Sequence, residues 1–363
     1  MSGSGGHLKR LIRRKGPLSL AEFMTEALWH PREGYYAQSP VLGAAGDYVT
    51  APEISQMFGE LLGLWSAAAW DRMGRPSPVL LVELGPGRGL MMADALRALR
   101  LRPDFRAAAE CHLVEASARL AEAQRARLAG HSLTWHRDIA GLPEGAVILI
   151  ANEFLDALPI LQLEQTAAGW RERLVDYDAA LQRFHFTLGL LPAAAAALLS
   201  REEQAAPVGS VAEVSPAAIS LVSNIARRVA ADGGIALFID YGRDTGSLGS
   251  TLQALKQHAR HDALEAPGSA DLTSHVDFAA LARAAREMGA RVHGPIAQGR
   301  FLLELGILGR ADHLVRAATA EQAEEIQAAL KRLIGGGEMG TLFKALAIAH
   351  PALPVPPGFE EVR

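Results

Sequence analysis

Acidic side chains directly follow an apolar stretch of the sequence at residues 145–151. Glu153 and Asp156 stand three residues apart, and Asn152 precedes them. A helical turn brings residues at this spacing together, and two carboxylates at one point suit a guanidinium, which presents five donors in a fixed fork. A buried carboxylate can also accept the proton that a nitrogen nucleophile loses. The stretch therefore predicts a substrate site with Glu153 and Asp156 as catalytic residues; the plainer alternative is that they cap the next helix.

Alternating glycines form a second motif, Gly-Pro-Gly-Arg-Gly at 85–89, between an apolar run at 79–84 and a stretch with helical spacing. Glycine allows positive φ and a close approach of the backbone to a ligand. The third glycine is one residue nearer than in the dinucleotide fingerprint. Glu83, just before the motif, would repel a pyrophosphate but attract a cation such as the α-amino group of S-adenosylmethionine. The residues predicted to bind this cofactor, unless the motif is a glycine turn without a ligand, are Glu83, Gly85, Gly87 and Gly89.

Three more polar residues end apolar runs further along the chain. Glu115 stands about thirty residues beyond the glycine motif, where nucleotide-binding α/β folds carry an acidic group that accepts hydrogen bonds from both ribose hydroxyls. Asp138 suits the exocyclic amine of an adenine ring or, alternatively, caps a turn. Asn152 offers a carbonyl. Because ligands of open α/β sheets bind beyond the carboxyl ends of the strands, we expect all three residues at the cofactor crevice.

Two other polar stretches contribute candidates. Residues 46–60 combine glycine, polar and aromatic residues before a long helix, which predicts an active-site lid carrying Glu53, or an ordered surface loop. Residues 271–278 place His275 close to carboxylates, but no third ligand with metal spacing lies nearby in the sequence. We therefore expect no metal and assign a proton relay to Glu53 or His275. The alternative for 271–278 is a helix start capped by Ser274.

The elements that must position these residues predict a doubly wound α/β fold. Apolar runs of strand length alternate with helical patterns, which favours a parallel sheet with helices on both faces. The last run is expected to lie antiparallel beside the two before it. Seven strands are predicted, at 79–84, 111–115, 133–138, 145–151, 233–242, 291–293 and 341–350.

Alternating patterns between 161 and 187 predict an antiparallel β subdomain, inserted into the sheet fold to bind substrate or a partner. The domain division follows from this. An N-terminal helical extension with the lid spans 1–75, the main domain spans 76–350 with the insertion at 160–212, and a loose tail spans 351–363.

Composition excludes several classes of protein. The 363 residues carry a net charge of −4, which gives no reason to expect a nucleic-acid partner. The single cysteine excludes an intrachain disulfide and a cysteine-rich metal site. No apolar stretch reaches the roughly 20 residues of a membrane span, and the N-terminus lacks the apolar centre of a secretory signal. The basic stretch at 9–15 is interpreted as a solvated helix face, with a transit peptide as the alternative. These features predict a cytoplasmic protein.

Four blocks, at 46–60, 83–89, 152–159 and 271–278, resemble the MidA family of S-adenosylmethionine-dependent methyltransferases. The resemblance runs from about His7 to His350 and implies the class I, Rossmann-like methyltransferase fold. On the family pattern the glycines at 85–89 hold the cofactor and Glu115 holds its ribose. The residues implied for the methyl acceptor are Asn152, Glu153 and Asp156.

Mitochondrial members of this family act in the assembly of respiratory complex I, where they look like protein arginine methyltransferases that make symmetric dimethylarginine. The resemblance therefore implies S-adenosylmethionine as cofactor and a protein substrate, with a complex I subunit as one candidate. A homodimer is a further expectation. The roles of Glu53 and His275 are inferred from motif position alone.

Two other functions stay open. A nicotinamide-dependent oxidoreductase is disfavoured by the tight glycine spacing. A non-catalytic assembly protein that binds S-adenosylmethionine only as a structural ligand is the main alternative, because the inserted strands and two tryptophans, Trp65 and Trp70, suit docking as well as catalysis.

Overall fold

The computed structural model describes residues 4–38, 50–244 and 248–360. Two compact units are assembled from segments far apart in the chain. The first comprises Met1–Tyr48, Asp156–Leu221 and Thr245–Ala280, and the second comprises Val49–Leu155, Val222–Asp244 and Leu281–Arg363. The division predicted from the sequence, with boundaries at 75, 160, 212 and 350, stays a prediction.

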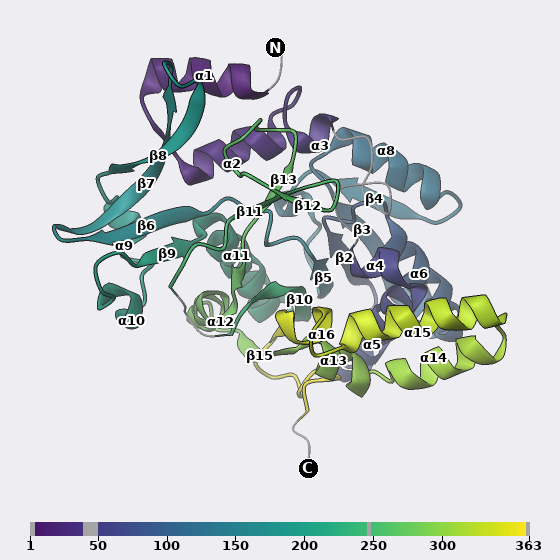
Figure 1. The fold of residues 1–363 in the computed structure, drawn as a ribbon. Coiled ribbons are helices and arrows are strands. Elements are labelled where there is room, and N and C mark those ends of the chain that lie inside the picture. Colours follow the sequence, from purple (N-terminus) through teal and green to yellow (C-terminus); the bar gives the residue numbers. More distant parts are fainter. Residues whose placement is uncertain (1–3, 39–49, 245–247, 361–363) are drawn as a thin grey trace. The chain divides into compact units, whose positions relative to one another are not determined.

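The second unit is built on a mixed sheet (Figure 1). Its strands are β2 (Val79–Leu84), β3 (Ala109–Val114), β4 (Leu133–His136), β5 (Val147–Asn152), β10 (Gly234–Arg243), β15 (Arg291–Ala297) and β16 (Phe343–Ala349). Their order is β15-β16-β10-β5-β2-β3-β4. An eighth short strand lies off this path, so the predicted number of seven is that of the strands on the path and not of the whole sheet. The strands from β10 to β4 are parallel, whereas β16 is antiparallel to both β10 and β15. The α/β fold with a largely parallel sheet is confirmed.

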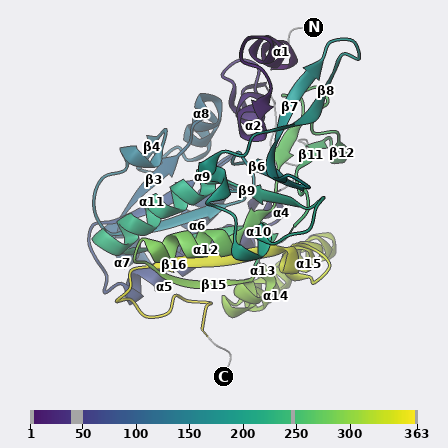
Figure 2. The ribbon, with the colours of Figure 1, turned by 90° about the vertical axis from the view of Figure 1, so that its left-hand side faces the viewer.

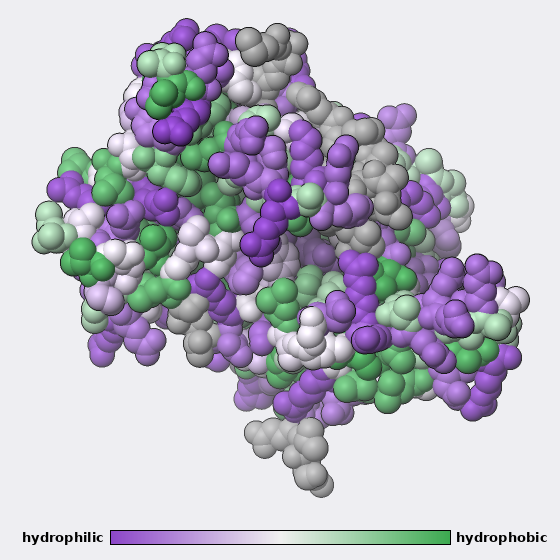
Figure 3. Space-filling model, in the orientation of Figure 1, coloured by the Kyte–Doolittle hydropathy of each residue, from purple (hydrophilic) through white to green (hydrophobic). Residues whose placement is uncertain are grey.

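Helices lie on both faces of this sheet, as expected for strands buried on both sides. They are α4 (Ala51–Ile54), α5 (Gln56–Arg72), α6 (Leu90–Ala98), α7 (Pro103–Ala108), α8 (Ala118–Arg127), α11 (Pro216–Asp232), α12 (Phe278–Glu287), α13 (Gln298–Glu304), α14 (Ile307–Arg316), α15 (Ala320–Ile334) and α16 (Met339–Leu342), with 3₁₀ turns η1 (Leu99–Leu101) and η2 (Ile139–Gly141). Figure 2 shows α11 and α12 side by side along one face. Figure 3 shows mostly hydrophilic residues on the outer surface of α15, whose apolar residues pack against the core. No helix in the described part of the chain is long and apolar enough to cross a bilayer.

Close packing of α5 on α6 requires a glycine. A Cβ atom at Gly63 would lie 2.7 Å from the Cα of Ala95, so any side chain there would force the two helices apart. Trp65, which follows two residues later on α5, is 1% exposed. Helix α5, the long helix after the predicted lid, is therefore a core element of the second unit.

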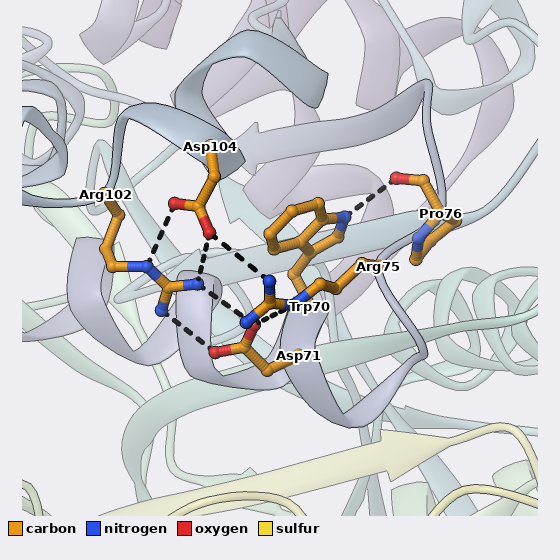
Figure 4. A network of polar contacts seen from close by, with 6 residues as sticks. All are labelled: Trp70, Asp71, Arg75, Pro76, Arg102 and Asp104. Carbon is orange, nitrogen blue, oxygen red and sulfur yellow. Dashed lines mark hydrogen bonds and ion pairs between the residues drawn. The ribbon is translucent and has the colours of Figure 1, made fainter.

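A polar network holds the end of α5 (Figure 4). Arg102 lies 3.0 Å from the carboxylate of Asp71 and 3.1 Å from that of Asp104, and Arg75 Nε lies 2.8 Å from Asp71. The hydrogen bond from Arg102 lowers the pKa of Asp104 to about 2. These partly exposed pairs join the end of α5 to the start of α7.

The first unit contains two antiparallel sheets. One comprises β1 (Leu18–Ser19), β6 (Leu161–Thr166), β7 (Gly169–Asp178), β8 (Arg183–Gly189) and β9 (Val211–Val214), and the other comprises β11 (Gln253–Lys256), β12 (Ala259–His261) and β13 (Asp271–Thr273). The remaining elements are α1 (Ser4–Lys15), α2 (Leu20–Trp29), α3 (Tyr35–Gln38), α9 (Ala193–Ala196), α10 (Arg201–Gln204) and the short strand β14 (Val276–Asp277). Ser19 and Glu22 form a capping box at the start of α2.

Residues 351–360, expected to form part of a loose tail, pack against the rest of the second unit. The indole Nε1 of Trp65 donates to the backbone carbonyl of Pro357 at 3.0 Å, and the ring of Phe359 contacts that of Phe301. A buried tryptophan needs an acceptor for its N–H group, and this stretch supplies one.

We predict that Trp65→Phe lowers the free energy of unfolding by about 1–3 kcal/mol, because it removes a buried hydrogen bond and leaves a small cavity. Urea unfolding measures this loss, and proteinase K should cleave near residue 357 faster than in the wild type. Phe359→Ala is the matched control, since it loosens the same stretch and leaves the indole intact. Unchanged stability and cleavage in Trp65→Phe would show that this contact does not hold the stretch.

Candidate active site

The glycine turn lies at the carboxyl end of β2 and leads into α6. Gly85, Gly87 and Gly89 have φ values of 60°, 53° and 75°, a region that other residues adopt only with strain. A Cβ atom at Gly85 would lie 2.5 Å from the ring of Phe154, which follows β5. The predicted positive φ is therefore present, and the close approach at Gly85 is to Phe154; an approach of this backbone to a ligand stays a prediction.

Glu83 is a buried carboxylate beside this turn. Only 3% of the residue is exposed, and its Oε2 has no hydrogen-bond partner among the residues that the structure describes. Burial, followed by the charge of Glu115, raises the pKa of Glu83 to about 8. A buried carboxylate oxygen without a hydrogen-bond donor is costly unless a cation compensates for it, so this group fits the positively charged amino group of S-adenosylmethionine.

Glu115 follows the neighbouring strand β3 and is 7% exposed. Its Oε1 accepts the backbone N–H of Ser117 at 2.8 Å, and its Oε2 accepts Nε2 of Gln124 at 3.0 Å. Burial raises the pKa of Glu115, and these two hydrogen bonds act in the opposite direction. A carboxylate oriented in this way suits a ribose diol.

Asp138 is exposed and acts as the N-cap of η2. Its Oδ1 accepts the backbone N–H groups of Ala140 at 2.9 Å and Gly141 at 3.2 Å. The capping alternative considered for Asp138 is thus realised, and its role toward an adenine ring stays a prediction.

Glu153 begins a strained turn after β5, with φ of 48°. Its Oε1 accepts the backbone N–H of Ala51 at 2.7 Å and Nδ2 of Asn152 at 3.1 Å. The side-chain amide oxygen of Asn152, Oδ1, is buried and makes no hydrogen bond to any described residue. This edge of the second unit therefore presents an oriented carboxylate next to an amide oxygen that is open to a donor.

Asp240 supports this turn from the end of β10. Its Oδ2 accepts the backbone N–H groups of Phe154 at 3.1 Å and Leu155 at 2.9 Å, and the residue is 1% exposed. The sequence places Asp240 at a strand end, but no local pattern indicates which distant backbone groups it binds.

Glu53 lies in α4 and faces the glycine turn. Its Oε1 is 3.6 Å from an Nη atom of Arg88, and its Oε2 accepts the backbone N–H of Thr50 at 3.4 Å. Burial, its largest influence, raises the pKa of Glu53 despite the nearby arginine. Residues 46–49 of the predicted lid lie outside the described residues.

Asp156 and His275 belong to the first unit. The backbone N–H of Ser274 donates to the carbonyl of Asp156 at 3.0 Å, so their two segments are adjacent. The backbone N–H of His275 donates to Oγ1 of Thr251 at 2.9 Å. Asp277, not Ser274, caps the start of α12 by accepting the N–H of Ala280. The catalytic roles of Asp156 and His275 stay predictions.

A possible metal cluster also lies in the first unit. His7, Glu26 and His30 each place a ligand atom within 4.8 Å of the others. However, Nδ1 of His30 accepts the backbone N–H groups of Arg32 and Glu33, at 3.3 and 3.1 Å. In the neutral ring this leaves the proton on Nε2, so neither nitrogen offers a lone pair to a metal. The cluster does not support a metal site.

Relatives of this chain have names that agree with the geometry. The mitochondrial protein arginine methyltransferase NDUFAF7 of Mus musculus is 38% identical over 358 residues, covering 92% of this chain and 79% of the relative. Its homologue in Drosophila melanogaster is 38% identical over 387 residues, covering 96% and 85%. A Burkholderia thailandensis protein solved with S-adenosylhomocysteine bound is 28% identical, with a TM-score of 0.82 over 99% of this chain and 94% of that one.

The prediction of a cytoplasmic protein is wrong, because these arginine methyltransferase relatives are named as mitochondrial proteins. That prediction used the single cysteine, the absence of an apolar signal and the interpretation of the basic stretch at 9–15 as a solvated helix face and not as a transit peptide. The first two properties do not distinguish one reducing compartment from another.

We predict that Gly85→Ala lowers the affinity for S-adenosylhomocysteine at least about tenfold, because the new methyl group would collide with Phe154 and displace the turn. Gly130→Ala is the control: Gly130 also has a positive φ, of 88°, but nothing lies within 4 Å of the position that its Cβ would occupy. Isothermal titration calorimetry should therefore show wild-type affinity in Gly130→Ala. Equal affinities in the two variants would contradict a close approach at Gly85.

We also predict that Glu83 makes the cofactor-free protein less stable as pH rises. Its pKa is about 8 in the folded state against 4.5 ordinarily, so the folded protein holds the proton more tightly than the unfolded chain does. This contribution is complete below about pH 4.5 and is lost as pH rises through about 8. Between about pH 6 and pH 9, the free energy of unfolding of the wild type should fall by at least about 1.4 kcal/mol more than that of Glu83→Gln, as measured by urea unfolding. Parallel pH profiles of the two proteins would contradict the assignment.

The family of the chain follows from these observations together. Residues 61–296 match a family model described as an S-adenosyl-L-methionine-dependent methyltransferase. This range includes the glycine turn, Glu83, Glu115 and the turn at Glu153. The chain therefore belongs to the MidA-like family of S-adenosylmethionine-dependent methyltransferases, with S-adenosylmethionine as its cofactor.

Proposed function

We propose that this methyltransferase acts on a guanidinium nitrogen of a protein arginine residue. The observation that carries the proposal is the oriented carboxylate of Glu153, held at Oε1 by two donors at the edge of the sheet where the glycine turn lies. The names of the relatives, protein arginine methyltransferases at 38% identity, support the same acceptor.

The turn that carries Glu153 is maintained against backbone strain. A positive φ at a residue other than glycine costs on the order of 1–3 kcal/mol, and Glu153 has φ of 48°. Its own N–H donates to the carbonyl of Ile239, and Asp240 accepts the next two N–H groups. Strain that is held in place by several hydrogen bonds is typical of residues whose direction matters for function.

S-adenosylmethionine, when bound, supplies a methyl group on a positively charged sulfur that departs as a neutral thioether and needs no acid. The attacking guanidinium nitrogen forms its bond to carbon as the carbon–sulfur bond breaks, and this nitrogen then loses a proton. Glu153 binds the guanidinium, directs one nitrogen and accepts that proton. Alignment of this kind contributes up to about 7–11 kcal/mol to lowering a barrier.

The finer parts of the proposal come from the sequence: the roles of Glu53 and His275 rest on motif position, the role of the insertion rests on its strand pattern, and the product and the candidate substrate rest on the family resemblance. Asp156 acts as the second carboxylate, and Glu53 or His275 relays the proton. The product is symmetric dimethylarginine, a respiratory complex I subunit is the candidate substrate, and the enzyme forms a homodimer. The antiparallel strands of the 160–212 insertion recognise the protein substrate.

We predict that Glu153→Gln reduces methyl transfer at least about 100-fold while its affinity for S-adenosylhomocysteine stays within about threefold of the wild type. The amide keeps the shape of the side chain but can neither form an ion pair with a guanidinium nor accept its proton. Purified protein, tritiated S-adenosylmethionine and host-cell proteins are incubated, and the labelled bands are hydrolysed and analysed for methylarginines.

Glu110→Gln is the control, because Glu110 is an exposed glutamate near the start of β3, at the opposite end of the strand from Glu115. It should label host proteins at the wild-type rate. Label on a residue other than arginine would overturn the acceptor, and wild-type transfer by Glu153→Gln would remove Glu153 from the mechanism. No label with any host protein would favour the non-catalytic alternative.

A further inference from the structure

One buried amide joins the two parts of the cofactor site. Gln124, on α8, is 0% exposed. Its Nε2 donates to the backbone carbonyl of Gly87 at 2.8 Å and to Oε2 of Glu115 at 3.0 Å, and its Oε1 accepts the indole N–H of Trp135 at 3.0 Å. Both N–H bonds of the amide and its oxygen are thus in use, so its orientation is determined.

We propose that Gln124 is a positioning residue for cofactor binding, which fixes the ribose carboxylate of Glu115 relative to the glycine turn. One –NH₂ group donates to both acceptors, so the distance between them cannot change without breaking a hydrogen bond. A buried acceptor that loses its donor is costly, and supporting side chains of this kind orient the groups that contact a ligand.

The contacts around Gln124 explain how it holds both Glu115 and the glycine turn. Ser117 N–H holds the other carboxylate oxygen of Glu115, so Gln124 completes the orientation of this group. Gly87 has φ of 53° and no side chain of its own, and its carbonyl is held from α8. Gln124 Cγ also lies 3.5 Å from the position that a Cβ of Gly89 would occupy, so α8 packs directly against the turn.

The sequence offers no signal for this role. Gln124 lies in a helix rich in arginine and alanine, nine residues after Glu115 and thirty-seven after Gly87. A glutamine in such a helix ordinarily faces solvent. The role of Gln124 is evident only from the orientation of α8, which turns this side chain inward.

We predict that Gln124→Met weakens binding of S-adenosylhomocysteine about tenfold, the size expected when a hydrogen bond to a charged group is lost. Gln298→Met is the matched control: Gln298 is also 0% exposed and donates to the carbonyl of Leu333 at 3.0 Å, from α13. In calorimetry the control should keep the wild-type Kd, whatever stability it loses. A role in stability alone would lower the fraction of protein that binds and leave the Kd of that fraction unchanged.

A second measurement tests the link to the ribose. The wild type should prefer S-adenosylhomocysteine to its 2′-deoxy analogue, and in Gln124→Met this preference should shrink about threefold or more, because Glu115 is no longer aligned. Gln124→Asn, which withdraws the amide by one methylene, should show the same change and serves if the methionine variant does not fold. Wild-type Kd and an unchanged preference in either folded variant would overturn the proposal. The test needs no methyl acceptor, so its outcome is independent of the arginine assignment.

Discussion

The burial of two carboxyl groups at the carboxyl ends of neighbouring strands is the constraint on which the second unit depends. Glu83 lies near the end of β2 and Glu115 follows β3; the two strands pair in parallel, and the residues are 3% and 7% exposed. Burial raises the pKa of both. Holding two carboxylates in this environment costs free energy in the empty protein. Two such groups suit a cation and hydroxyl donors, and the fold keeps them buried at the expense of its own stability, a common compromise at functional sites.

The side chains that support this edge of the sheet come from distant segments. Asp240 holds the turn after β5, and Gln124 holds both the glycine turn and Glu115. Glu53 approaches the glycine turn through Arg88. Each of these contacts constrains the backbone or a charged group and not an apolar surface. The geometry of this site therefore depends on hydrogen bonds and ion pairs made by groups that are themselves largely buried.

The strands and the glycine turn could be predicted because their signals are local. A continuous apolar run such as 79–84, followed by alternating glycines, has few other interpretations. The partners of Asp240 and Gln124 could not be predicted, since they depend on strand order and on the rotation of a helix. The packed stretch at 351–360 was missed for the same reason: its anchor, Trp65, lies almost 300 residues earlier. The seven predicted strands omitted an eighth that is only two residues long and has no sequence pattern of its own.

The position of β16 has a consequence for how the chain reaches its native state. This strand comes from residues 343–349, yet it pairs with β10 on one side and with β15 on the other. Until it is in place, β10 presents an open row of backbone donors and acceptors in the middle of the finished sheet. Pairings between segments about a hundred residues apart are slow to form, and intermediates with such edges are prone to self-association. During synthesis, the nascent protein must therefore keep its central strands protected until its final strand arrives.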